Sequence, residues 1–103
     1  MSSNELDKKV TYRPQFTLLG LNLASAIFLS QAVSWTNENG GWFTKTMDEW
    51  ASVTGLSKYQ QKYARTKLVD MGVLVEKQQG MPRRIYSYVD FNALDKAIKV
   101  VSQ

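Results

Sequence analysis

Histidine and cysteine are both absent from this 103-residue chain. The chain therefore has no imidazole base, no thiol nucleophile, no disulfide and no thiolate zinc site. No glycine-rich phosphate loop occurs, and the carboxylates of Asp48 and Glu49 suit the first turn of a helix, where the helix dipole favours negative charge. We expect no catalysis, no cofactor and no metal ion, in a reduced, cytoplasmic protein. The chemistry that remains is non-covalent binding.

Basic side chains are concentrated in one segment of the chain. The net charge is +4, from 13 basic and 9 acidic residues. Residues 57–89 carry seven basic and two acidic side chains, whereas the rest of the chain carries six and seven. A basic excess confined to one segment is expected for phosphate contacts. The alternative is a lysine-rich face that is merely solvated.

Within this segment, lysine, tyrosine and threonine share one face of a helix that begins near residue 58. At about 100° per residue, Arg65 and Val69 lie at the edge of that face. Such side chains reach base edges and phosphates in a major groove. Farther along, Arg83 and Arg84 follow a Gly-Met-Pro turn and suit the minor groove or the flanking backbone. The predicted DNA-binding residues are Ser57, Lys58, Tyr59, Lys62, Tyr63, Arg65, Thr66, Lys77, Arg83 and Arg84.

Other roles stay open for several of these residues. Tyr59 and Tyr63 could pack against the hairpin that follows, or stack with Tyr86 on the bases of single-stranded DNA. The lysines and Arg65 could be generic surface charges.

A long uncharged stretch, residues 14–37, precedes these candidates. Asn22 is a good N-cap, and the sequence from there to about Thr36 is apolar almost all round, which predicts a helix in the middle of the core. The stretch is long enough to span a bilayer, but its many serine, asparagine and glutamine residues disfavour insertion, so we expect no membrane span. Three tryptophans are expected in the core, namely Trp35, Trp42 and Trp50.

Two capping boxes predict a helix-turn-helix. Thr46 and Glu49 predict one helix start, with an end near Val53, and Ser57 and Gln60 predict another, with an end near Met71. On the inner side of the second helix we expect Gln60, Ala64, Leu68 and Met71. Gln61 is expected at the margin of this side, where helix-turn-helix sequences commonly have valine or isoleucine. Its amide must find a partner, or the contact between the helices is looser.

The remaining elements complete an α+β, mainly helical fold. We expect a short strand at 42–45, a hairpin of strands at 73–78 and 85–89, and a last helix capped by Asp90. This order predicts a winged helix-turn-helix with a two-stranded wing, a domain over residues 10–103 after a flexible tail at 1–9, and a short extended segment at 10–12. The last helix packs onto the first helix or pairs with a second copy in a homodimer, through the apolar residues Phe91, Leu94, Ile98 and Val101.

The chain resembles the N-terminal winged-helix domain of replication initiators of phages and mobile elements, often called replisome organisers. The residues that match are GLNLASAIFLSQ at 20–31 with Trp35, GWFTKT at 41–46 with Glu49 and Trp50, TGLS at 54–57 with Tyr59 and Gln60, and Leu68 with MGVL at 71–74. Gln61 departs from the motif.

The resemblance implies non-catalytic binding of double-stranded DNA at a replication start, with replication proteins as partners and a separate C-terminal region that recruits helicase machinery. The chain is then either a domain of such a protein or a small stand-alone DNA-binding protein. The alternatives are a winged-helix transcriptional regulator and a winged helix that serves as a protein-interaction module.

Overall fold

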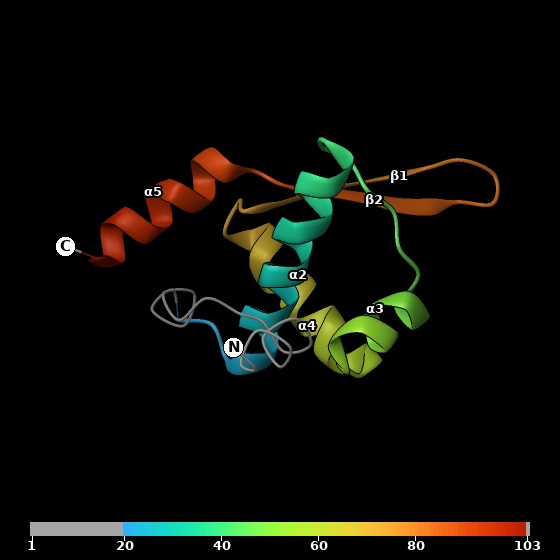
Figure 1. Ribbon diagram of the computed structural model, residues 1–103, viewed down its shortest axis with the longest axis horizontal. Coiled ribbons are helices and arrows are strands. Elements are labelled where there is room, and N and C mark those ends of the chain that lie inside the picture. The colour runs from blue at the N-terminus through green and yellow to red at the C-terminus, as the bar shows by residue number, and fades with distance from the viewer. Residues whose placement is uncertain (1–19, 103) are drawn as a thin grey trace, which may run out of the picture.

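The central element of the fold is the nearly uncharged helix α2 (Leu23–Asn39) (Figure 1). It begins as predicted at Asn22, whose Oδ1 accepts a hydrogen bond from the Ser25 amide at 2.8 Å. It ends later than predicted, because residues 37–39 continue the helix until Gly40, at φ 66°, closes it. The structure is a computed structural model that describes residues 20–102, with side chains through residue 100. The predicted tail at 1–9 and the extended segment at 10–12 lie outside this range.

Both predicted capping boxes begin helices, α3 (Met47–Thr54) and α4 (Lys58–Asp70). The Oγ1 atom of Thr46 accepts a hydrogen bond from the Glu49 amide at 3.1 Å, and the Glu49 carboxylate accepts one from the Thr46 amide at 2.7 Å. Ser57 and Gln60 make the same reciprocal pair of bonds, at 3.1 and 2.9 Å. Because each box satisfies backbone donors within a single turn, its spacing in the sequence is enough to locate the helix start.

Gln61 is fully buried between α3 and α4, so its predicted position at the margin of the inner side is wrong. Its Nε2 donates hydrogen bonds to the backbone oxygens of Met47 and Leu56, both at 3.1 Å. The amide therefore joins the start of α3, the turn and the start of α4. Gln60 is also misplaced by the prediction: it is exposed, because its side chain turns back to cap the helix.

A hairpin follows α4 and extends away from the body of the molecule (Figure 1). Its antiparallel strands are β1 (Leu74–Gln79) and β2 (Arg84–Val89). Leu74 pairs with Val89 at the base, and Gln79 pairs with Arg84 at the tip. The buried pair at the base anchors the hairpin in the core, while the tip is exposed.

The predicted strand at 42–45 forms a single bridge to the hairpin. The backbone amides and carbonyls of Phe43 and Ser87 exchange two hydrogen bonds, both at 2.8 Å. This pairing turns Phe43 inward, and successive side chains of an extended segment point to opposite sides. Trp42 therefore faces outward with 39% of its surface exposed, so its predicted place in the core is wrong. It packs edge-on against Tyr88, with ring centroids 4.6 Å apart.

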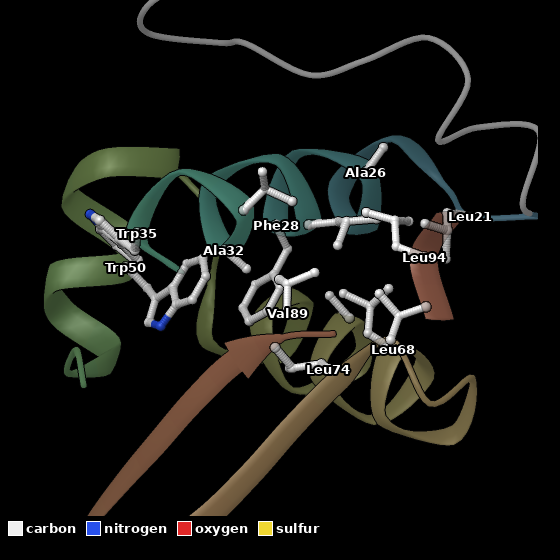
Figure 2. Packing of buried hydrophobic residues seen from close by; sticks show 14 of the residues in the cluster. Leu21, Ala26, Phe28, Ala32, Trp35, Trp50, Leu68, Leu74, Val89 and Leu94 are labelled. Atoms are coloured by element: carbon white, nitrogen blue, oxygen red, sulfur yellow. The ribbon is translucent and has the colours of Figure 1, made fainter. Parts of the chain in front are cut away.

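Aromatic rings from α2 and α3 stack in the core (Figure 2). Phe28 and Trp50 lie parallel with centroids 3.9 Å apart, and Trp35 meets Trp50 edge-on at 4.6 Å. Both tryptophans are buried, as predicted. This stack packs α3 against α2, and α4 contacts both helices.

The last helix, α5 (Phe91–Ser102), projects from the body on the side opposite the hairpin (Figure 1). Asp90 caps it as predicted, since its Oδ1 accepts a hydrogen bond from the Ala93 amide at 3.1 Å. Leu94 is buried in the core and Ile98 packs against that core, whereas Phe91 is 42% exposed. The side chain of Val101 lies outside the described range. The predicted stripe thus packs within the chain only in part, and pairing with a second copy stays a prediction.

Over residues 20–102 the fold is α+β and mainly helical, with four helices and one two-stranded antiparallel sheet, as predicted. Within the same range, no helix combines the length and the apolar character that crossing a membrane requires. The predicted order of helix, strand, helix pair, hairpin and helix is observed except for the strand at 42–45, which is a single bridge.

Candidate nucleic-acid interface

The outer face of α4 carries most of the predicted binding residues. The inner face of the helix is buried at Gln61, Ala64 and Leu68, which turns the opposite side chains to solvent. Tyr59 is 78% exposed and Tyr63 is 49% exposed, although burial of the apolar tyrosine ring would be favourable in free energy. The exposed residues of this outer face are Ser57, Lys58, Tyr59, Lys62, Tyr63 and Thr66. A face of lysine, tyrosine and hydroxyl groups suits phosphates, base edges and base planes.

Tyr59 and Tyr63 lie beside the start of α2, so the alternative that they pack against the hairpin is wrong. With Asn22, Ala24 and Gln60 they line a hollow of about 720 Å³. Both rings are therefore available to a ligand.

Arg65 lies at the edge of the outer face, as predicted, and points toward the hairpin. Its Nε is 2.7 Å from the Oε2 of Glu76 on β1, and the two side chains are only 15% and 21% exposed. The guanidinium also lies 5.7 Å from the centroid of the Phe28 ring. A paired and largely buried arginine is less available to DNA than its exposed neighbours. Its evident role is to join α4 to the hairpin.

Two carboxylates near this surface are expected to titrate on opposite sides of the ordinary glutamate value of 4.5. Burial raises the pKa of Glu76, and the adjacent Arg65 only partly offsets it. The hydrogen bond from the Thr46 backbone lowers the pKa of Glu49.

Each shift has a consequence for stability. The raised pKa of Glu76 adds to the free energy of unfolding below pH 4.5, and this contribution is lost as the pH rises through the pKa of Glu76 in the folded protein. The lowered pKa of Glu49 adds to the free energy of unfolding above pH 4.5, and this contribution is lost as the pH falls through the pKa of Glu49 in the folded protein. An NMR titration of the carboxyl carbons checks both directions, and a Glu76 that titrates below Glu49 contradicts them.

The hairpin places its three predicted cations in different surroundings. Arg84 is exposed at the tip, and Arg83 is exposed there too while donating a hydrogen bond to Gln78 at 3.2 Å. Lys77 is exposed on β1, and its Nζ lies 4.3 Å from the centroid of the Trp42 ring. Such a contact holds the ammonium group in place by cation–π attraction. The Lys77 ammonium group is thus held on the side of the sheet where the Trp42 ring lies.

One cation that the sequence analysis missed is Lys45. It is half-buried just before α3, and its Nζ lies 4.9 Å from the centroid of the Trp35 ring. It lines a hollow with Arg65, Arg83 and Arg84. Lys45 lies outside the segment of basic excess, so charge counting along the chain could not find it. The one signal in the sequence that could point to Lys45 is its position directly before the predicted helix cap, Thr46.

Comparisons of the chain with protein-family models, with curated proteins and with solved structures find no match. What defines the class of the site is therefore its geometry: an exposed helix face and a hairpin tip, both cationic, with Arg65 at the edge of that face lining the same hollow as Arg83 and Arg84 of the tip. Over the described residues no group of histidine, cysteine, aspartate or glutamate could hold a metal ion.

Proposed function

We propose that this chain is a winged-helix domain that binds double-stranded DNA. In this arrangement α4 enters the major groove and the hairpin serves as the wing beside it. The observation that carries the proposal is that the outer face of α4 is cationic and aromatic while its inner face is buried, with the arginines of the hairpin tip alongside. The helix pair, its turn and the hairpin follow one another in the order that a winged helix requires.

Each part of the surface has its own task in this proposal. Lys58 and Lys62 contact phosphates, and Thr66 and the two tyrosines of the outer face reach the bases. Arg83 and Arg84 contact the backbone or the minor groove beside the helix. The ion pair between Arg65 and Glu76 fixes the angle between helix and wing, since it is short and largely shielded from solvent.

Within this class we propose replication initiation for a phage or mobile element as the biological role. The support is the resemblance of the segments around Trp42, Trp50 and Ser57 to replication initiators. A transcriptional regulator would use the same surface and differ in whether the full gene product has a helicase-recruiting region. Expression of the gene in a plasmid replication assay separates the two roles.

The proposed DNA binding is expected to depend steeply on salt. If the five exposed cations of α4 and the hairpin contact phosphates, the logarithm of the binding constant falls against the logarithm of salt concentration with a slope of about −4.5. This corresponds to a loss of about 500-fold in affinity between ~50 and ~200 mM salt. These cations are Lys58, Lys62, Lys77, Arg83 and Arg84.

Fluorescence anisotropy of a labelled duplex at several salt concentrations measures this slope. A single strand of the same length is the comparison, because stacking on the tyrosines alone would favour it over the duplex. Absence of duplex binding at the lowest salt concentration refutes the proposal.

A further inference from the structure

A hollow of about 330 Å³ lies between the start of α3, the middle of α4 and the tip of the hairpin. Residues far apart in the sequence line it, among them Thr44, Lys45, Arg65, Arg83 and Arg84. The hydroxyl of Thr44 donates a hydrogen bond to the Ile85 carbonyl at 2.8 Å, which ties this wall to the hairpin. The hollow therefore has walls from three elements that are joined to one another.

The charge around this hollow favours an anion. Arg83 and Arg84 are exposed and Lys45 is half-buried, and none of the three forms an ion pair within the described residues. Arg65 is already paired with Glu76, so its charge is balanced. The Glu49 carboxylate lies near Lys45 and Arg84 but is held by the Thr46 amide at 2.7 Å. Three cations against one engaged carboxylate leave a positive site.

Lys45 is held in place before any ligand arrives. Its ammonium group lies 4.9 Å from the centroid of the buried Trp35 ring, and the residue is half-buried. A lysine that is already restrained loses less conformational entropy on binding than a free surface lysine. The ammonium group also keeps its donors for a ligand, because an aromatic ring attracts charge without using up hydrogen bonds.

We propose that this hollow seats a phosphodiester group of the DNA backbone and that Lys45 is a DNA-binding residue. The inference rests on the proposed duplex binding and adds to it a phosphate position between α3 and the hairpin tip. A strand that passes the edge of α4 at Arg65 and reaches the arginines of the hairpin crosses this hollow, because the same residues line it. Lys45 contacts this phosphate, and Arg83 and Arg84 contact the phosphates next to it along the strand.

The test compares Lys45→Met with Lys96→Met, the same charge change at an exposed position on α5. For Lys45→Met, affinity is expected to fall about tenfold at ~0.1 M salt, since a hydrogen bond to a charged group is lost. The salt slope becomes shallower by about 0.9, the contribution of one phosphate. Lys45→Arg retains the wild-type slope. Fluorescence anisotropy at several salt concentrations gives each slope, and near-ultraviolet circular dichroism checks the fold.

The outcomes separate the two proposals. If the wild-type chain binds no duplex, the proposed function fails. If the wild type binds and Lys45→Met has the same slope as Lys96→Met, the duplex binding stands and the phosphate position is refuted. Should Lys45→Met not fold, Lys45→Gln, which removes the same charge but keeps a polar side chain, replaces it, and a slope equal to that of Lys96→Met likewise refutes the phosphate position.

Discussion

Replacing both Lys62 and Arg83 with glutamate is expected to weaken duplex binding by about 100-fold or more at ~0.1 M salt. Lys62 lies on the outer face of α4 and Arg83 at the hairpin tip, and both are exposed. Two lost charge-assisted contacts together cost about 3 kcal/mol, which is about a factor of 100 in affinity. The new carboxylates add repulsion from the phosphates. Titration of a labelled duplex measures the loss.

The matched control is a double reversal on α5, Lys96→Glu with Lys99→Glu. It changes the net charge equally but lies on the helix that projects away from the hairpin (Figure 1). We expect it to weaken binding far less. Equal losses in the two double variants would mean that net charge, and not the surface of α4 and the hairpin, governs binding. If the chain is instead a protein-interaction module that binds through α2 or α5, the complex survives the reversal of Lys62 and Arg83.

Replacing Gln61 with alanine is expected to lower the free energy of unfolding by about 3 kcal/mol and Tm by about 15 °C. The side chain is fully buried, so its removal leaves a cavity between α3 and α4. It also removes the hydrogen bonds that Nε2 donates to the carbonyls of Met47 and Leu56, each at 3.1 Å. A buried carbonyl without a donor costs about 1–3 kcal/mol. Urea unfolding followed by circular dichroism measures the change.

Gln61→Leu separates the two causes, because leucine fills most of the space and donates no hydrogen bond. We expect a loss of about 1–2 kcal/mol, smaller than for alanine and due to the two carbonyls. The control is Gln79→Leu on the exposed end of β1, which should stay within about 0.5 kcal/mol of the wild type. A Gln61→Leu variant as stable as the wild type would show that the amide bridge adds nothing to stability.

Helix starts could be predicted well from the sequence, whereas side-chain burial could be predicted only in part. Asn22, Thr46, Ser57 and Asp90 all cap helices as predicted, because a cap needs only residues up to three positions away. Helix ends were less certain: residues 37–39 have turn-forming side chains yet continue α2, since Gly40 offers the left-handed conformation that ends it.

The candidate site likewise has a part that could be predicted from the sequence and a part that could not. The periodicity of α4 was enough to place Lys58, Lys62 and Thr66 on one exposed face, because the geometry of a helix is regular. The ion pair of Arg65 with Glu76 and the hollow around Lys45 depend on where the hairpin lies, and no local spacing encodes that position.

Composition and local order alone decided that this chain lacks histidine and cysteine, that its basic excess lies at 57–89, and that a helix pair is followed by a hairpin. Caps, periodicity and turn residues act over a few positions, so they can be read along the chain. Tertiary packing decided that Gln61 bridges two helices, that Trp42 faces outward and that Lys45 joins the arginines of the hairpin. Burial and charge clusters arise from contacts between distant segments, which exist only once the chain has folded.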